Sequence, residues 1–344
     1  MARIAVDAMG GDFAPRAPIA GALHALASLA PEHDIELVGR IGEIEAELQT
    51  LLSGELSALV PQRARLHLVD APDVIEMTDK PTVALRGKTK SSMVVGLKRV
   101  AEGHAQGFVS AGNTGAQMAA SLVLLKLHAG LTRPAIGTIF PTSAQPVLVL
   151  DSGANVDCSA EELVQFARIG DVYARALLGR TNPAIGLLSI GEEAEKGNAV
   201  VKEAHQRLVQ SGLHFIGNVE GRDVPRGVCD RGPIDVVICD GFVGNVLLKF
   251  YESLAPTLIR MVADAAGLDA RHITKALTHL DADEHGGAPL LGVQGVSIIS
   301  HGKSSPRALM NAIRVAVRAY ESGMTGEIGR RLAESMPAVS GTAA

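Results

Sequence analysis

The sequence predicts an α/β fold in which helices flank a largely parallel sheet. Two observations support this prediction: six apolar runs each lead into a short polar turn that contains glycine, and most of these turns precede a helical pattern. Strand, turn and helix repeated in this order are typical of parallel sheets. The six junctions are IAVDAMGGD (4–12), VSAGNTG (109–115), VLDSGAN (149–155), LLSIGEEAEKGN (187–198), ICDGFVGN (238–245) and IISHGKSS (298–305).

The expected strands are short runs rich in Val, Ile and Leu, which suit a buried strand. They lie near residues 3–7, 35–38, 66–69, 108–110, 136–140, 147–151, 185–189, 236–240 and 296–300. The expected helices have apolar residues at three- and four-residue spacing, as a helix with one buried face requires. The clearest are 18–29, 91–102, 115–127, 160–178, 197–211 and 306–321.

Residues 246–280 break the alternation, because two helical patterns follow one another there without a strand between them. We predict a helical pair that projects from the sheet, in which Pro256 kinks the first helix or joins two helices. The apolar circumference of its first part favours a buried or dimer-forming helix over one that contacts lipid. Because no long linker is evident, residues 1–334 are expected to form a single domain and residues 335–344 a frayed tail.

Composition narrows the function classes. The chain has 344 residues, 3% aromatic residues, no Trp and a formal net charge of −5, which argues against a nucleic-acid binder. Neither a signal peptide nor an apolar stretch long enough to span a bilayer is recognisable, so we expect a cytoplasmic protein, at most peripherally associated with the inner face of the membrane.

The glycine-containing turns predict an anion site. Glycine lets a backbone approach an anion closely, and several converging N–H groups can then hold a phosphate. In a parallel sheet the carboxyl ends of successive strands lie along one edge, where ligands bind. We therefore expect the six turns, with their Asn, Ser, Lys and His side chains, to gather at one edge.

No cofactor and no metal are predicted. The first turn lacks the G-x-G-x-x-G spacing of a dinucleotide site, and the three cysteines have no metal-ligand spacing. Cys239 is expected to be an inert, packed thiol. Asp7, Asp151 and Asp240 end strands, where we favour helix caps or orienting groups over ligands of a divalent metal.

Taken together, the motifs resemble the bacterial phosphate acyltransferases, the PlsX family of phospholipid synthesis. The resemblance covers nearly everything from Ile4 to about Ala319, although Ser152 and His285 depart from the family pattern. The matching motifs are AVDAMGGD (5–12), TDKP (78–81), SSMVVGL (91–97), SAGNTGA (110–116), TRPA (132–135), GAN (153–155), IGEEAEKGN (190–198), GNVEGRD (217–223), CDGFVGNVLLK (239–249) and HGGAPLLG (285–292).

The resemblance implies transfer of a long-chain acyl group from acyl-[acyl carrier protein] to inorganic phosphate. The acyl phosphate formed would serve a membrane glycerol-3-phosphate acyltransferase in phosphatidic acid synthesis. It also implies a three-layer α/β/α sandwich similar to isopropylmalate dehydrogenase and phosphotransacetylase, and a homodimer. The departures from the family pattern leave this chemistry intact, whereas the short helical insertion weakens the expectation of membrane contact.

The reaction itself indicates which residue types are needed. Phosphate is already an anion at neutral pH, so it needs positioning and a stabilised oxyanion more than a strong base. Lys196 is our first candidate for neutralising phosphate or the oxyanion, and Asn245, expected at a helix start, is the second. The alternatives are an exposed helix lysine and an N-cap asparagine, and the resemblance favours the catalytic roles.

The remaining candidates are predicted to bind phosphate or substrate. The set comprises Asp7, Gly10, Gly11, Asn113, Thr114, Gly115, Asn155, Asn198, His301 and Lys303. Because no nucleophile triad is evident, we expect direct transfer in a ternary complex. The acidic carrier protein is expected to dock on a basic patch, either Arg86 with Lys88 and Lys90, or Arg330 with Arg331.

Two other functions remain open from the sequence. One is a phosphotransacetylase-like enzyme that uses coenzyme A thioesters of short acids, which would need a pocket closed against long chains. The other is a non-catalytic, membrane-associated scaffold in which the helical pair at 246–280 recruits partners.

Overall fold

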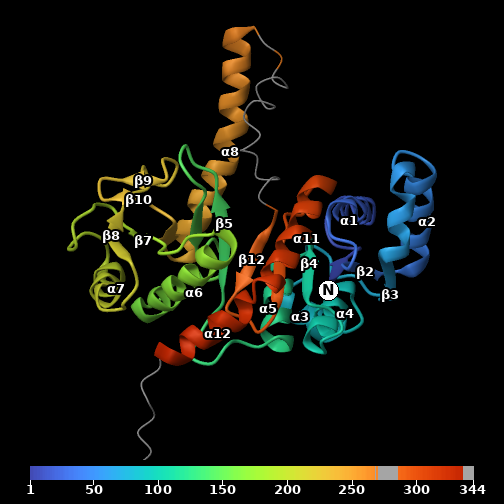
Figure 1. The fold of residues 1–344 in the computed structure, drawn as a ribbon, viewed down its shortest axis with the longest axis horizontal. Coiled ribbons are helices and arrows are strands. Elements are labelled where there is room, and N and C mark those ends of the chain that lie inside the picture. Colours follow the sequence, from blue (N-terminus) through green and yellow to red (C-terminus); the bar gives the residue numbers. More distant parts are fainter. Residues whose placement is uncertain (268, 270–285, 336–344) are drawn as a thin grey trace, which may run out of the picture.

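The computed structural model describes residues 1–267, 269 and 286–335, and its centre is an eleven-stranded sheet (Figure 1). The strand order is β3-β2-β1-β4-β13-β12-β5-β6-β11-β7-β8. The strands are β1 (Arg3–Asp7), β2 (Asp34–Gly39), β3 (Leu66–Asp70), β4 (Gly107–Ser110), β5 (Ala135–Phe140), β6 (Val147–Leu150), β7 (Ile185–Leu188), β8 (Phe215–Val219), β11 (Val236–Ile238), β12 (Ala288–Leu291) and β13 (Val296–Ile299); β9 (Val228–Cys229) and β10 (Gly232–Pro233) form a separate hairpin.

All nine expected strands are present, and the sequence analysis missed β8 and β12 in the sheet. The reason lies in their composition. β8 has the sequence FIGNV, in which Gly217 and Asn218 interrupt the apolar run, and β12 has the sequence APLL, which contains a proline. Such short, interrupted runs carry little strand signal until neighbouring strands supply hydrogen-bond partners.

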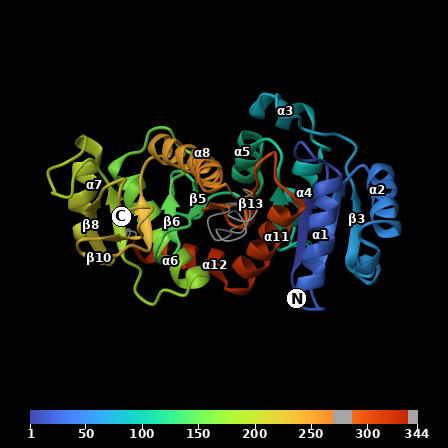
Figure 2. The same cartoon turned by 90° about the horizontal axis from the view of Figure 1, so that it is seen from above.

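Helices cover both faces of the sheet, which confirms the predicted three-layer sandwich (Figure 2). One face carries α1 (Arg16–Ser28), α2 (Ile41–Ser53), the 3₁₀ helix η1 (Ser57–Arg65), α6 (Ala160–Leu178), α7 (Ala199–Val209), α11 (Pro306–Glu321) and α12 (Met324–Ser335). The other face carries α3 (Pro81–Gly87), α4 (Ser92–Ala101), α5 (Thr114–Leu124) and α8 (Gly241–Ala266).

Local signals explain why the best-predicted helices begin and end where they do. In α6 the Ser159 hydroxyl accepts from Glu162 N–H while the Glu162 carboxylate accepts from Ser159 N–H, which is a capping box. Gly179 ends the same helix in the left-handed region, at φ 67°. In α11 the Ser305 cap precedes Pro306, whose fixed φ suits the first helical position.

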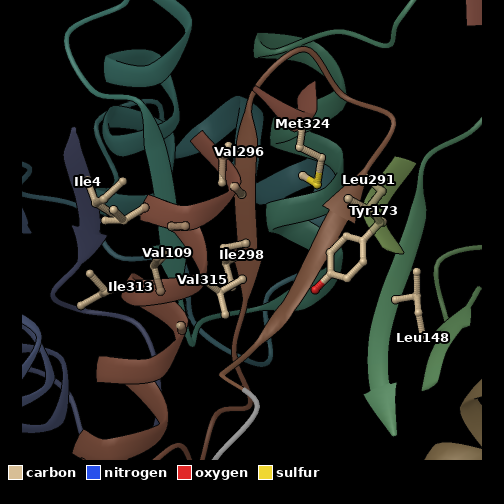
Figure 3. Packing of buried hydrophobic residues seen from close by; sticks show 14 of the residues in the cluster. Ile4, Val109, Leu148, Tyr173, Leu291, Val296, Ile298, Ile313, Val315 and Met324 are labelled. Atoms are coloured by element: carbon tan, nitrogen blue, oxygen red, sulfur yellow. The ribbon is translucent and has the colours of Figure 1, made fainter. Parts of the chain in front are cut away.

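The largest core lies between the sheet and the helices of the first face (Figure 3). Ile313 and Val315 of α11 face Ile4 of β1 and Ile298 of β13 in this core. Helix α1 packs closely on α11 because Gly21 has no side chain: a Cβ there would lie 2.8 Å from Leu309 Cβ. The apolar residues that the sequence placed on strands and helix faces therefore meet in one continuous interior.

The direction of the strands differs from our expectation. β3, β2, β1, β4 and β13 are mutually parallel, and we call them the first block; β6, β11, β7 and β8 are also mutually parallel, and we call them the second block. Between the blocks, the pairs β13–β12, β12–β5 and β5–β6 are all antiparallel. Three reversals leave the two blocks running in opposite directions.

The expectation that all six turns share one edge was therefore wrong. The carboxyl ends of the first block lie at one edge of the sheet, and those of the second block lie at the opposite edge. Three turns follow each block. An apolar run indicates that a strand exists but not which way it runs, so the sequence pattern did not reveal the reversal.

The expected join between two helices at Pro256 is also corrected. Helix α8 is continuous from Gly241 to Ala266, so Pro256 does not join two helices, and α8 projects beyond the body of the molecule (Figure 1). Residues 268 and 270–280 of the expected pair, like the expected tail from residue 336 on, lie outside the described residues. Ser335 belongs to helix α12, which the sequence analysis missed. Among the described helices, none has the length and apolar character required to cross a membrane.

Candidate active site

At the carboxyl edge of the first block, three turns contact one another: residues 8–12 after β1, residues 111–113 after β4 and residues 300–305 after β13. We call them the first-block loops. Asp12 N–H donates to the Gly302 carbonyl at 2.7 Å. A Cβ on Gly11, whose φ is +102°, would lie only 3.0 Å from the same carbonyl oxygen. A Cβ on Gly10 would lie 2.9 Å from the backbone nitrogen of Gly112. The structure thus brings the predicted glycines together with the neighbouring turns.

Asp7, the last residue of β1, holds the loops at this edge by hydrogen bonds. Its buried carboxylate accepts the Ser110 hydroxyl at 2.7 Å and the Met9 N–H at 3.1 Å. Burial raises the pKa of Asp7, and hydrogen bonds from Ser92, Ser110 and the following backbone N–H groups partly offset that rise. The geometry gives Asp7 a role in shaping the loop.

Asn113 is a helix cap and a clamp. Its Oδ1 accepts from Ala116 N–H at 3.0 Å, and its Nδ2 donates to the carbonyls of Met77 and Asp79, each at 3.1 Å. Its side chain thereby holds the segment that contains the TDKP motif, a partnership that the sequence analysis missed. Thr114 and Gly115 form the first turn of α5, where backbone N–H groups lack partners within the helix and favour anions.

His301 and Lys303 supply exposed positive or protonatable groups at the same edge. The Lys303 N–H donates to His301 Nδ1 at 3.2 Å, which fixes the position of the ring relative to the turn. The first-block loops and the adjoining N-terminus of α5 combine a helix N-terminus, closely packed glycines and two basic side chains, which is the chemistry that binds phosphate.

At the opposite edge, Asp151 holds together the turn that follows β6. Its Oδ1 accepts from the N–H groups of Ile136, Gly153 and Ala154, and its Oδ2 accepts from Asn155 through both N–H and Nδ2, at 2.7 to 3.2 Å. Burial raises the pKa of Asp151, and these donors oppose the rise. The Asn155 amide also donates to the Pro134 carbonyl at 2.7 Å, so the structure engages it in the fold.

The start of α8 packs directly on this turn. Gly241 N–H donates to the Asn155 carbonyl at 2.7 Å, and a Cβ on Gly244 would lie 1.8 Å from the Asp151 carbonyl oxygen. Asp240 caps the helix by accepting from Val243 N–H at 2.8 Å, which confirms the predicted capping role of this strand-end carboxylate.

Asn245 therefore lies within α8 and does not begin it, which corrects our expectation of a helix-start asparagine with extra backbone donors. Its exposed carboxamide lies beside Gly153, where a Cβ would be 3.5 Å from Asn245 Oδ1. Helix α8 then runs across the sheet to the other edge. There the Tyr251 Oη donates to the carbonyl oxygen of Pro141, just beyond β5, at 2.5 Å. β5 runs in the direction of the first block, so α8 links the two edges.

Lys196 and Asn198 lie in the turn after β7, two strands beyond β6 in the sheet. Lys196 is exposed, with its aliphatic stem over Gly191, where a Cβ would lie 2.8 Å from Lys196 Cγ. Asn198 caps α7 by accepting from Val201 N–H at 2.9 Å. The structure brings Asn155 and Asn245 together, places Lys196 and Asn198 at the same edge, and separates all four from the first-block loops.

Burial disfavours the reactive thiolate form of both thiols near Asp151. Cys239 is buried and donates to the Asp151 carbonyl at 3.4 Å, and burial raises its pKa well above the ordinary value, which confirms the predicted inert thiol. Burial likewise raises the pKa of Cys158 to about 12. In the part of the chain that the structure describes, no group of three His, Cys, Asp or Glu side chains is arranged to hold a metal ion.

Comparison with known proteins now identifies the family. The profile of the family described as "Fatty acid synthesis protein" matches residues 2–326. The chain belongs to this family. The Phosphate acyltransferase of Desulfitobacterium hafniense (strain Y51) is 46% identical over 342 residues, which cover 96% of this chain and 98% of the relative. The Phosphate acyltransferase of Heliobacterium modesticaldum is 46% identical over 336 residues, which cover 95% of this chain and 96% of the relative.

Solved structures show the fold that the family shares with more distant proteins. The EutD phosphotransacetylase from Staphylococcus aureus matches with a TM-score of 0.60 at 15% identity, over 93% of this chain and 94% of that one. A phosphotransacetylase from Streptococcus pyogenes matches with the same TM-score and coverage at 18% identity. These matches confirm the predicted phosphotransacetylase-like fold. At such low sequence identity they show a shared fold and do not show a shared activity.

Proposed function

We propose that this chain transfers a long-chain acyl group from acyl-[acyl carrier protein] to inorganic phosphate and releases acyl phosphate. The observation that supports the transfer is the near full-length identity of 43–46% to curated relatives named Phosphate acyltransferase. In the reaction a phosphate oxygen bonds to the thioester carbonyl carbon, the carbon–sulfur bond breaks, and the thiolate leaves. The identity of the donor as a carrier protein rests on the resemblance to the family.

We propose that phosphate binds at the first-block loops. The support is that β4 and β13 are neighbouring strands: the turn after β4 leads into the first turn of α5, with the Thr114 and Gly115 N–H groups, and the turn after β13 exposes His301 and Lys303. Gly10 and Gly11 allow the β1 turn to approach the same position. In this proposal Asp7 and Asn113 keep the loops in shape and do not touch the anion.

We propose that Asn245 donates a hydrogen bond to the oxyanion that develops on the thioester carbonyl. Asn245 is exposed and uncharged, and it lies on the helix that links the two edges. It precedes Tyr251 by six residues, which is about 9 Å along the helix axis at 1.5 Å per residue. Lys196 is proposed to act from the turn after β7, which lies one strand further from the first block than β11, the strand that precedes α8. The position of Asn245 therefore gives it stronger support than Lys196 has.

The decisive experiment compares one variant from each edge, using acyl phosphate formation from palmitoyl carrier protein and phosphate. Asn245→Ala should lower kcat about 10²- to 10³-fold, as loss of an oxyanion donor does. Lys303→Ala should raise the KM for phosphate roughly tenfold with a smaller change in kcat, because it removes a charge that holds the ground-state anion. Lys196→Ala completes the series, and circular dichroism confirms folding.

The outcomes separate the competing functions. A wild-type enzyme that uses acetyl-coenzyme A but not the palmitoyl carrier would favour the phosphotransacetylase alternative, and an inactive wild type would favour the scaffold. If Lys303→Ala left the KM for phosphate unchanged while Asn245→Ala raised it, the proposal that phosphate binds at the first-block loops would be wrong.

We propose that the carrier docks on Arg86, Lys88 and Lys90, since Arg330 and Arg331 are already engaged by Glu327 on their own helix. Arg86 and Lys90 are exposed, and Lys88 pairs with Asp79 at 2.6 Å in the segment that Asn113 clamps. Charge reversal of Arg86 should raise the KM for the carrier without affecting the KM for phosphate, and equal effects on both would contradict this docking surface.

We propose a cytoplasmic homodimer that contacts the membrane peripherally and delivers acyl phosphate to a membrane glycerol-3-phosphate acyltransferase. The support is the apolar stripe on projecting α8, which includes exposed Val246, Phe250, Leu258 and Met261. Phe250→Glu should shift the mass measured by light scattering from dimer to monomer. An unchanged dimer that no longer sediments with lipid vesicles would assign the stripe to the membrane.

A further inference from the structure

Three turns at the carboxyl edge of the second block each expose a large apolar side chain. Val156 follows β6 and is 67% exposed, Ile190 follows β7 and is 83% exposed, and Phe242 follows β11 and is 62% exposed. These strands are neighbours in the order β6-β11-β7 and are parallel, so their turns are adjacent. Isolated apolar residues are common on surfaces, whereas apolar residues that gather on adjacent turns indicate an interaction site.

A backbone hydrogen bond and the strand register place the three turns side by side. Gly241 N–H donates to the Asn155 carbonyl at 2.7 Å, which joins the residues immediately before Phe242 and Val156. In the β11–β7 ladder Ile238 pairs with Leu187, the last pair before the two turns that carry Phe242 and Ile190. We call Val156, Ile190 and Phe242 the apolar patch.

The same edge carries the candidate catalytic groups. Phe242 and Asn245 are three residues apart on α8 and therefore share one face of the helix. Ile190 and Lys196 belong to the same turn after β7, and the N-termini of α7 and α8 add partial positive charge there. An apolar surface beside positive charge and an amide donor matches a molecule with a hydrocarbon tail and an anionic or polar head.

We infer that the apolar patch binds the hydrocarbon chain of the acyl group, next to its reacting carbonyl, and that it sets the preference for long chains. This inference rests on the proposed acyl transfer and extends it, because it names which residues recognise the chain. Charge complementarity selects this occupant: the oxyanion that develops on the thioester carbonyl suits the Asn245 amide and Lys196, and the hydrocarbon tail suits the patch.

The test compares chain-length preference in matched variants. Phe242→Ala should raise the KM for palmitoyl carrier protein roughly tenfold, because contact with an aromatic side chain is lost, and should change the KM for butyryl carrier protein less than about twofold. Val156→Ala should act in the same direction with a smaller effect. Val209→Ala is the control, since Val209 is 65% exposed on the same block but lies at the end of α7, outside the patch.

Two readouts keep the inference separate from the proposed function. Isothermal titration calorimetry with palmitoyl carrier protein in phosphate-free buffer measures binding without turnover, and Phe242→Ala should weaken it roughly tenfold, consistent with the expected KM effect. If the wild type forms acyl phosphate but Phe242→Ala weakens both chain lengths equally, or Val209→Ala matches Val156→Ala, the inference fails and the function stands. If the wild type binds palmitoyl carrier in a Phe242-dependent manner but forms no acyl phosphate, the function fails and the chain-binding patch stands.

Discussion

The turns of the two blocks look alike in sequence but differ in what their polar residues do. At the first block, backbone N–H groups and the side chains of His301 and Lys303 are exposed. The side chains of Asp7 and Asn113 instead form hydrogen bonds that hold the loops. At the second block, Asp151 and Asn155 form the internal scaffold, and Lys196 and Asn245 face outward. A strand-end carboxylate thus organises the turn at each edge, and the neighbouring exposed residues remain accessible to substrate.

The largest expected difference between the two edges is in how much side-chain volume each tolerates. Gly244→Ala should destabilise the protein by more than about 4 kcal/mol or prevent folding, because its Cβ would lie 1.8 Å from a backbone oxygen that cannot rotate away. Gly10→Ala should cost less, about 1–3 kcal/mol, because its Cβ would overlap its neighbours less severely, at 2.7 Å from Asp7 Oδ2 and 2.9 Å from the Gly112 nitrogen.

Chemical denaturation followed by circular dichroism measures this contrast. Gly42→Ala in α2 is the control, because no atom lies within 4 Å of its Cβ position, and it should leave stability unchanged or raise it by up to about 1 kcal/mol. Equal midpoints for Gly244→Ala and Gly42→Ala would show that α8 does not pack on the β6 turn as described.

The next effect concerns the two organising carboxylates. Asp151→Asn should cost about 2–4 kcal/mol, because an amide offers NH₂ where the carboxylate accepts backbone N–H groups from Ile136 and Asn155. Asp7→Asn should cost less, about 1–2 kcal/mol, because the Ser110 hydroxyl can rotate to accept from the new amide. Urea denaturation at pH 7.5 checks the order, and a larger loss for Asp7→Asn would reverse the comparison.

The smallest expected effect is the pH dependence of these carboxylates. Because burial raises the folded-state pKa of Asp151 above its ordinary value of 3.8, its contribution to stability is fully present below 3.8 and is lost as the pH rises through the folded-state pKa. The stability of the wild type relative to Asp151→Asn should therefore fall between pH 4.5 and 7.5, and Asp7, whose pKa is raised for the same reason, should behave alike.

Urea denaturation of wild type and variant at several pH values across that range measures the sign. A wild type that gains stability over Asp151→Asn as the pH rises would show that the five hydrogen bonds outweigh burial and keep the carboxylate ionised.

Much of the candidate site was visible in the sequence because the relevant signals are local. Glycine-containing turns after apolar runs located Gly10, Gly11 and the α5 N-terminus, and the expected helices 160–178 and 306–321 match α6 and α11. The sequence analysis predicted that Asn113 and Asn198 bind phosphate or substrate, and in the structure both side chains cap helices. An asparagine can serve either as a helix cap or as a substrate-binding residue, so only its hydrogen-bond partners in the structure distinguish the two roles.

The sequence by itself determined the α/β class, the nine expected strands, the helix caps and the family, because periodicity, caps and motifs are properties of short segments. The tertiary structure alone decided that β12, β5 and β6 reverse the sheet, that α8 is one helix linking two edges, and that the predicted site residues form two sets. Strand direction and the meeting of distant turns depend on which strands pair, and that pairing is set by contacts between segments far apart in the chain.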